Sequence, residues 1–300
     1  MVSSTAPRTA LLASRTRFEE KRLLEALDRR GIPCTAIDTR TVRHHLHDTP
    51  PPWDLVLNRE ISATKALYAA LTYESAGVTV INSATAIETC GDKWRTSLAL
   101  RAAGIPTPPA ALALTAQAAE EAAEEIGYPV VLKPLVGSWG RRVALIPDAA
   151  ALRTVLEYSE ALPSPLAKLA YLQRYVDKPD RDIRVIVVGG IPIGAMYRTS
   201  DGWRTNVARG ATTTACPLTD DLAKLAATAA RETGADLAGV DLVEDADGGL
   251  QVLEVNHGVE FKGFQEAHTD RIDVAELIVE RLVLGADRRM DRETVREVGA

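Results

Sequence analysis

The order of apolar and helical segments in the first 85 residues constrains the fold more than any other feature of this sequence. Apolar runs predict four strands, at residues 8–14, 34–39, 53–57 and 78–82. Between them, the segments FEEKRLLEALDRRGI and TKALYAALTYESAG carry apolar residues at helical spacing and a glycine suited to end a helix. Strand–helix–strand order predicts a parallel sheet with right-handed crossovers, and therefore a small open α/β domain.

The rest of the sequence predicts hairpins instead of crossovers. A single helix is expected over residues 87–104, followed by the strand YPVVLKPL, the loop GSWGRR and the return strand VALIPD. Further on, DIRVIVVGG and IPIGAMYRTS join at a glycine pair, and AGVDLVEDADGGLQVLEVN reads as two strands around a turn. An α/β domain followed by such antiparallel sheets gives a mixed α/β and α+β fold class.

Length favours more than one domain, since 300 residues correspond to about two. We expect an N-terminal α/β domain over residues 1–88, a central subdomain over 89–168, a C-terminal subdomain over 169–285 and a frayed, charged tail over 286–300. Hydrophobic residues make up 46% and charged residues 25% of the chain, which is a globular composition and argues against disorder.

Charge and cysteine content exclude several classes of function. The formal net charge of −6 gives no general attraction to nucleic acid or to an anionic membrane. The three cysteines, Cys34, Cys90 and Cys216, lack CxxC spacing, which argues against a disulfide framework or a cysteine zinc site. Because no apolar segment is long enough for a secretion signal or a membrane span, we expect a cytoplasmic protein in a reducing compartment.

The last predicted hairpin carries a candidate metal site. Alternation along the strand places Glu254 and Asn256 on one face, and Asp241 lies on the preceding strand. Acidic residues on strands are often only solvated, but these sit among apolar neighbours, where a charge needs a partner. Carboxylate and amide oxygens next to nucleotide phosphates suit Mg²⁺.

Two lysines and a glycine loop are candidate phosphate ligands. Lys133 ends an apolar strand, and the small residues of the loop at 137–142 would let backbone N–H groups approach phosphate oxygens. The loop is neither a P-loop nor a dinucleotide-binding motif, and an ordinary hairpin turn would look similar. Lys93 alone would more often be a solvated surface lysine.

Two polar segments could complete such a site. The segment YRTSDGWRTNVARG contains Arg198, Arg204 and Arg209 together with Asn206, and guanidinium groups bind phosphate or carboxylate bidentately. An exposed basic loop is the simpler interpretation. In YLQRYVDKPDRDIRV, a strand runs into a polar stretch with Asp182, which could bind ribose hydroxyls.

Taken in order, these motifs resemble the ATP-grasp ligases, and most closely the RimK/LysX branch. The strings that carry the resemblance are IETCGDKWRTSLALRAAGIPTP, VVLKPLVGSWGRRVA, RTNVARGA and LEVNHGVEFKGF. The resemblance covers roughly residues 50–285 and implies an ATP-grasp fold, in which two subdomains hold ATP between antiparallel sheets, behind a small parallel pre-ATP-grasp domain.

The resemblance also implies a role for each candidate residue. The nucleotide would contact Lys93, Lys133, the lid residues Gly137, Ser138, Trp139, Gly140 and Arg141, the hinge residues Gln173, Arg174 and Val176, and Asp182 at the ribose. Arg204, Thr205 and Asn206 would reach the γ-phosphate, with Arg204, Asn206 and Arg209 as catalytic residues. Asp241, Glu254 and Asn256 would hold one or two Mg²⁺ ions. Family members often carry an acidic residue where this chain has Arg174.

The implied reaction is ATP-dependent formation of a C–N bond through an acyl phosphate, with release of ADP and phosphate. The implied partners are a small acidic LysW-like amino-group carrier protein, whose C-terminal glutamate is activated, and 2-aminoadipate, glutamate or a related amino acid. Relatives commonly form homo-oligomers, dimers or tetramers. The alternatives are a RimK-like glutamate ligase with another acceptor, and a nucleotide-binding regulatory module without catalysis.

The amino-acid substrate is expected to carry an acidic or polar end group on its side chain. Arg198, Arg209, His257 and Lys262 would form a donor-rich substrate pocket, although Arg209 could bind phosphate instead.

Overall fold

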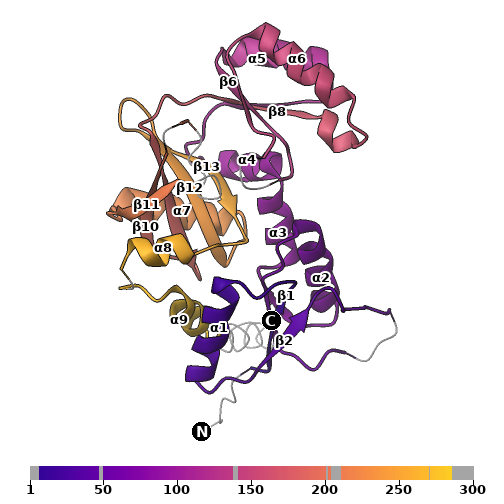
Figure 1. Cartoon of the computed structure of the whole chain (residues 1–300), viewed down its shortest axis with the longest axis vertical. Helices are drawn as coiled ribbons and strands as arrows, with labels where there is room; N and C mark the ends of the chain where they lie inside the picture. Colours follow the sequence, from indigo (N-terminus) through magenta and orange to yellow (C-terminus); the bar gives the residue numbers. More distant parts are fainter. Residues whose placement is uncertain are drawn as a thin grey trace, which may run out of the picture.

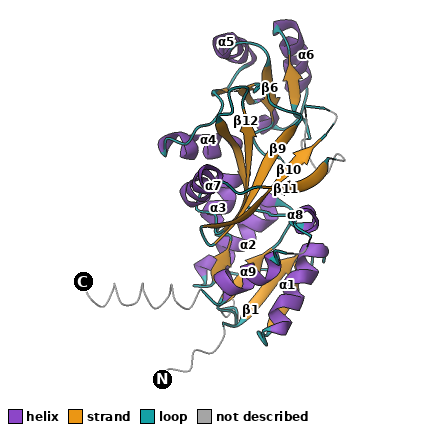
Figure 2. Ribbon diagram, turned by 90° about the vertical axis from the view of Figure 1, so that its left-hand side faces the viewer, coloured by secondary structure: helices purple, strands orange, loops and turns teal. Residues whose placement is uncertain are grey.

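The structure is a computed structural model, and its three sheets follow one another along the long axis (Figures 1 and 2). The sheet formed by the middle of the sequence, called the middle sheet, lies at one end of the molecule. The C-terminal sheet lies at the centre, and the N-terminal sheet lies at the other end. No helix among the residues described is long and apolar enough to cross a membrane. The structure describes residues 7–46, 50–137, 141–200, 202–203, 211–269 and 271–285. The predicted tail over 286–300 lies outside them.

The N-terminal sheet is parallel, as predicted, with the strand order β2-β1-β3-β4. Its strands are β1 (Thr9–Ala13), β2 (Cys34–Asp38), β3 (Leu55–Asn58) and β4 (Thr79–Ile81). Helices α1 (Phe18–Arg29) and α2 (Ala63–Ser75) cover opposite faces. Leu11 of β1 packs in one core with α1, whereas its neighbours Ala10 and Leu12 pack in another with α2, because alternate residues of a strand face opposite sides.

The single helix predicted over residues 87–104 is two helices, α3 (Ala84–Gly91) and α4 (Lys93–Ala102). Asp92 breaks the helix because its backbone is extended, with φ −118° and ψ 120°, and its carboxylate accepts hydrogen bonds from the N–H groups of Trp94 and Arg95. The break brings the N-terminus of α4 to the middle sheet, where Lys93 N donates to Leu135 O at 3.0 Å.

The middle sheet is antiparallel with the order β5-β8-β6-β7. Its strands are β5 (Ala110–Ala113), β6 (Val130–Lys133), β7 (Ala144–Ile146) and β8 (Ala170–Arg174). Helices α5 (Ala116–Ile126) and α6 (Ala149–Glu160) pack on it, and a 3₁₀ turn (Pro165–Lys168) leads into β8. Because β8 pairs with β5 and β6, this sheet extends to Arg174, past the predicted boundary at residue 168.

The C-terminal sheet is antiparallel with the order β11-β10-β9-β12-β13. Its strands are β9 (Arg181–Val188), β10 (Ile191–Thr199), β11 (Thr212–Cys216), β12 (Leu237–Glu244) and β13 (Leu250–Asn256). Helix α7 (Asp220–Glu232) packs on Val185 and Val187, and α8 (Lys262–Ala267) packs on the face that carries Ile186 and Val188.

The C-terminal helix joins the last segment of the chain to the N-terminal domain. Helix α9 (Val274–Ile278) continues into a π-helical turn (Val279–Val283) and lies beside α1 (Figure 1). One hydrophobic core includes residues of β1, α1, β9, α8 and α9. Ion pairs from Arg22 to Asp273 (2.8 Å) and from Arg30 to Glu276 (2.7 Å) flank this contact. The N-terminal sheet is therefore fixed against the C-terminal sheet.

Asn82 makes a second connection between these two sheets. It follows β4 and is 3% exposed. Its side chain accepts from Leu237 N at 2.9 Å and donates to the carbonyl oxygens of Leu237 (2.7 Å) and His257 (2.9 Å). The amide thus satisfies three backbone groups, at the start of β12 and just after β13.

We expect Asn82→Ala to lower the free energy of unfolding by about 2–4 kcal/mol, because it leaves three buried backbone groups without partners. Urea unfolding monitored by fluorescence and circular dichroism measures this loss. Thr72→Ala is the control, since that hydroxyl is exposed and bonds only to Tyr68 O in its own helix. Equal stability of the two variants would show that the Asn82 connection is not needed.

Candidate active site

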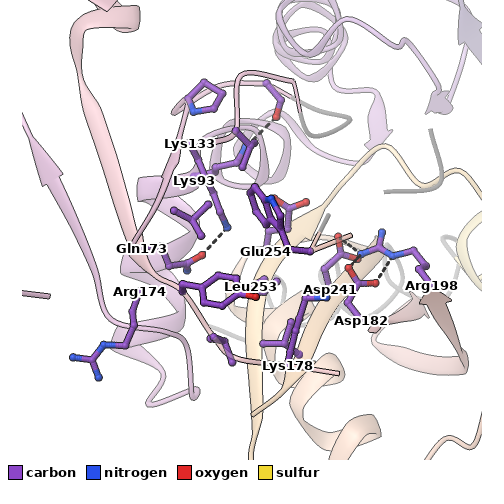
Figure 3. Close-up of a pocket in the computed structure, with 18 of the residues that line it drawn as sticks. Lys93, Lys133, Gln173, Arg174, Lys178, Asp182, Arg198, Asp241, Leu253 and Glu254 are labelled. Atoms are coloured by element: carbon purple, nitrogen blue, oxygen red, sulfur yellow. Dashed lines mark hydrogen bonds and ion pairs between the residues drawn. The ribbon is translucent and has the colours of Figure 1, made fainter. Parts of the chain in front are cut away.

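A cavity lies between the middle sheet and the C-terminal sheet (Figure 3). The middle sheet contributes Lys133 and Gln173 to its wall, and the C-terminal sheet contributes Asp241 and Glu254. Figure 3 shows basic and amide groups on one side and an acidic cluster on the other, with Glu254 between them. The structure thus brings together residues that are far apart in the sequence.

The two predicted phosphate lysines lie close to each other in this cavity. Lys133 Nζ donates to Gln173 Oε1 at 2.6 Å, and Lys93 Nζ donates to Gly137 O at 3.0 Å. The pKa of Lys133 is lowered to about 8, mainly by burial of its ammonium group; the charge of Glu254 opposes this shift, and that of Lys93 adds to it. Both lysines can therefore contact an anion bound in the cavity.

The predicted hinge follows β8, and its side chains do not all face the cavity. Gln173 is 1% exposed and holds Lys133, while Val176 lines the cavity, as do the apolar side chains of Val131 and Leu253. The guanidinium of Arg174 points away (Figure 3) and donates to Ile126 O at 2.8 Å. Arg174 can thus contribute backbone and stem atoms, but its charge lies outside the site.

The acidic cluster is built around Asp241. Arg184 donates to both of its oxygens, at 2.7 and 2.8 Å, and Arg198 NH2 lies 3.1 Å from Oδ2. Arg198 also donates to both oxygens of Asp182, at 2.6 and 2.8 Å. Burial of Asp241 raises its pKa, but the two arginines outweigh that effect and lower it to about 2. Asp241 is therefore ionised and fixed in orientation.

These contacts change the interpretation of two predicted residues. Arg198 was expected to bind a substrate carboxylate, but it is 3% exposed and its guanidinium is already paired with Asp182 and Asp241. Asp182, expected at the ribose, is 6% exposed and uses both oxygens to hold Arg198. In this structure, both residues position Asp241.

Sequence reasoning assigned no role to Arg184 or to Lys178. Arg184 lies within a buried strand, between Ile183 and Val185, and an arginine in such a position signals an acidic partner. Lys178 lines the cavity and donates to Arg181 O at 3.0 Å. Because Lys178 lies in a polar loop, its sequence context did not indicate a role in the cavity.

The predicted metal ligands are neighbours on β12 and β13. Asp241 pairs in register with Glu254, and Asn256 Nδ2 lies 3.4 Å from Asp241 Oδ2 and 3.3 Å from Glu254 Oε1. These hard oxygen donors fit Mg²⁺, and rotation of the Asn256 amide would exchange its NH2 for its oxygen. No group of three or more His, Cys, Asp or Glu side chains suited to a metal occurs in the described chain.

A second cavity of about 620 Å³ adjoins the first and reaches the N-terminal domain. The two cavities share Lys93, Gly137 and Glu254. His257 lines the second cavity, and burial together with the charge of Arg59 lowers its pKa to about 4, so it is neutral at physiological pH. The two cavities therefore meet at one point, next to the candidate metal ligands.

The structure describes only some of the remaining predicted site residues. Arg141 lines the first cavity. Lys262 lines neither of these two cavities, since it lies exposed on α8 and pairs with Glu266; the structure thus does not bring Arg198, His257 and Lys262 into one substrate pocket. Ser138, Trp139, Gly140, Arg204, Thr205, Asn206 and Arg209 lie outside the described residues.

Comparison with known proteins identifies the family. Residues 90–282 match the RimK-like ATP-grasp domain, and residues 9–89 match the LysX preATP-grasp domain. Glutamate–LysW ligase ArgX of Sulfolobus acidocaldarius is 35% identical over 274 residues, which cover 91% of this chain and 96% of that protein. Alpha-aminoadipate–LysW ligase LysX of Saccharolobus solfataricus is 33% identical over 268 residues, covering 88% and 97%.

A solved structure agrees with this match. The crystal structure of a RimK domain ATP-grasp protein from Sphaerobacter thermophilus superposes with a TM-score of 0.77 at 26% identity, covering 91% of this chain and 98% of that one. The three-sheet arrangement that forms the two cavities thus belongs to a known fold. This chain is a member of the RimK-like ATP-grasp family and carries a LysX-type pre-ATP-grasp domain at its N-terminal end.

Proposed function

We propose that this protein is an ATP-dependent carboxylate–amine ligase of amino-acid biosynthesis. It joins 2-aminoadipate, glutamate or a related amino acid, through its amino group, to the C-terminal glutamate of a small acidic LysW-like carrier protein. The observation that carries the proposal is the meeting of two cavities at Lys93, Gly137 and Glu254, because a phosphoryl donor in one can react there with an acceptor in the other. The LysW ligases among its relatives support the choice of carrier.

In this proposal ATP occupies the first cavity. The apolar lining residues Val131, Val176 and Leu253 receive the adenine, and Lys93 and Lys133 contact the phosphates. We further propose that Gly137, Arg141 and the neighbouring lid residues close over the phosphates, and that Arg204, Thr205, Asn206 and Arg209 act at the γ-phosphate. Asp241, Glu254 and Asn256 would hold Mg²⁺, which when bound neutralises charge on the phosphates.

The proposed reaction requires the protein to position its substrates and does not require a nucleophilic side chain. A carboxylate oxygen of the carrier attacks the γ-phosphorus of ATP, the bond to the β-phosphate oxygen breaks, and ADP leaves. The amine of the amino acid then attacks the acyl carbon and expels phosphate. Lys93 and Lys133 stabilise the negative charge that moves onto the phosphate oxygens, and Arg184 and Arg198 keep Asp241 ionised and oriented beside them.

A RimK-like ligase with another acceptor is less favoured, because residues 9–89 match the pre-ATP-grasp domain of LysX. We also propose that the enzyme works in the cytoplasm as a homo-oligomer of two or four copies, which light scattering of the purified protein tests.

The direct test is mass spectrometry of a LysW-like carrier after incubation with the enzyme, ATP, Mg²⁺ and a panel of amino acids. We expect the carrier mass to rise by one amino acid minus one water, with one ADP released per conjugate. A carrier without its C-terminal glutamate is the control and should stay unmodified. Equal ADP release with that truncated carrier, or without any carrier, would contradict the proposed acceptor.

The metal assignment is tested by Glu254→Gln. The substitution keeps the shape of the side chain but removes a charge, so we expect kcat to fall about 100-fold or more while magnesium-free ADP binding is retained. Glu244→Gln is the matched control: it lies on the same sheet, pairs with Arg181 at 2.9 Å and lines neither cavity. Near-normal turnover of Glu254→Gln at saturating Mg²⁺ would refute the assignment.

The phosphate role of Lys133 predicts a dependence on pH. With a pKa of about 8, Lys133 is cationic below that pH and becomes neutral above it, whereas bound phosphate favours the cation. We therefore expect magnesium-free ADP affinity to fall as the pH rises from about 7 to about 9, with proton uptake on binding near the upper end. Calorimetry in two buffers of different ionisation enthalpy measures the uptake. The Lys133→Arg variant keeps its charge over this pH range, so it should show no such proton uptake. Unchanged uptake in the variant would exclude Lys133 as the group that takes up the proton.

A further inference from the structure

We propose that the crevice at the carboxyl edge of the N-terminal sheet binds the incoming amino acid, and that Arg15 binds its side-chain carboxylate. The inference deepens the proposed function and rests on it. It replaces the predicted donor set of Arg198 and Lys262, which the structure does not bring together. In this proposal Arg15 determines specificity and takes no part in bond making.

The crevice lies where the topology of the N-terminal sheet favours a ligand. In the order β2-β1-β3-β4, the chain leaves β1 toward β2 on one side and later returns through β3 on the other side. The connections after β1 and β3 therefore diverge, and open α/β sheets bind ligands at such switch points. Both connections line the second cavity, the first through Ser14, Arg15 and Arg17 and the second through Asn58, Arg59 and Glu60.

Of the three arginines in this wall, Arg15 is the one available to a ligand. Arg17 pairs with Glu20 at 2.9 Å and Glu260 at 2.8 Å, and the buried Arg59 pairs with Glu20 and donates to Val259 O. Arg15 is exposed and has no hydrogen bond or ion pair within the described part of the chain. Its planar guanidinium can bind a carboxylate through two parallel hydrogen bonds.

Hydrogen bonds of a buried carboxylate hold the wall next to Arg15 in place. Glu60 is 6% exposed, and its carboxylate accepts from Thr39 Oγ1 (2.5 Å), Ser62 N (2.9 Å) and Ser14 Oγ (3.2 Å). It thereby ties together the segments that follow β1, β2 and β3, and fixes the backbone next to Arg15. The first turn of α2, beginning after Ser62, opens into the same crevice and adds the positive end of a helix dipole.

The position and size of the crevice favour the amino acid as its occupant. A volume of about 620 Å³ is in the range of small-molecule sites. Lys93 and Glu254 border both cavities, so an amino acid held by Arg15 in the second cavity can present its amine at the junction, where the acyl phosphate forms. There the amine lone pair forms the C–N bond, the C–O bond to phosphate breaks, and the amine loses a proton to solvent.

The test is Arg15→Gln, assayed with a carrier that the wild-type enzyme modifies. We expect KM for glutamate or 2-aminoadipate to rise about 10- to 100-fold, with unchanged KM for ATP and carrier, and the preference for glutamate over glutamine to fall by a similar factor. Arg15→Lys keeps the charge without the planar group and should recover part of the loss. Arg40→Gln is the matched control, because Arg40 is also exposed, lies two residues after the neighbouring β2 and pairs with Asp38.

Hydroxylamine separates this inference from the proposed function. It traps the carrier acyl phosphate as a hydroxamate and releases phosphate without any amino acid, so Arg15→Gln should form hydroxamate at the wild-type rate. Normal amino-acid kinetics in Arg15→Gln would overturn the inference. So would a raised KM for the carrier, because the crevice would then bind the carrier tail. A wild-type enzyme that forms neither hydroxamate nor conjugate would refute the proposed function, and the inference with it.

Discussion

The orientation of one buried carboxylate, that of Asp241, governs the arrangement of the site. A carboxylate that is 3% exposed carries a large desolvation cost unless cations neutralise it, and here Arg184 does so from β9, which pairs with β12, and Arg198 from β10, the next strand of the sheet. Asp182 in turn holds Arg198. These ion pairs fix the side chain of Asp241 on β12. Glu254 and Asn256 of β13 therefore lie beside a carboxylate of fixed orientation.

A second constraint is the joint between the N-terminal sheet and the C-terminal sheet. One hydrophobic core runs through both, and Asn82 binds the backbone of β12 and of the segment after β13. Glu19 accepts hydrogen bonds from the N–H groups of Phe261 and Lys262 at 3.1 Å, which fixes the same segment to α1. The wall of the second cavity therefore combines residues of two domains that cannot move apart without exposing apolar surface and buried polar groups.

The two cavities give the ligase reaction its geometry. The residues proposed to bind phosphate and those proposed to bind metal meet at their junction, and the wall of the second cavity adds residues of the N-terminal domain that the first cavity lacks. In the proposal for Arg15, the amino acid is selected at the carboxyl edge of the N-terminal sheet, apart from the residues proposed for phosphoryl transfer.

The sequence alone determined the parallel N-terminal domain, the antiparallel hairpins and the family, because apolar periodicity and the motifs around Lys93, Lys133 and Glu254 are local properties of the chain. It also predicted Asp241, Glu254 and Asn256 as neighbours, since adjacent strands of a hairpin fix that register. The turning away of Arg174 and the pairing of Arg198 were decided only by tertiary structure. In both cases the partner, such as Ile126 O for Arg174, lies far away in the sequence, and a charged side chain takes whichever buried partner the packed sheets bring within reach.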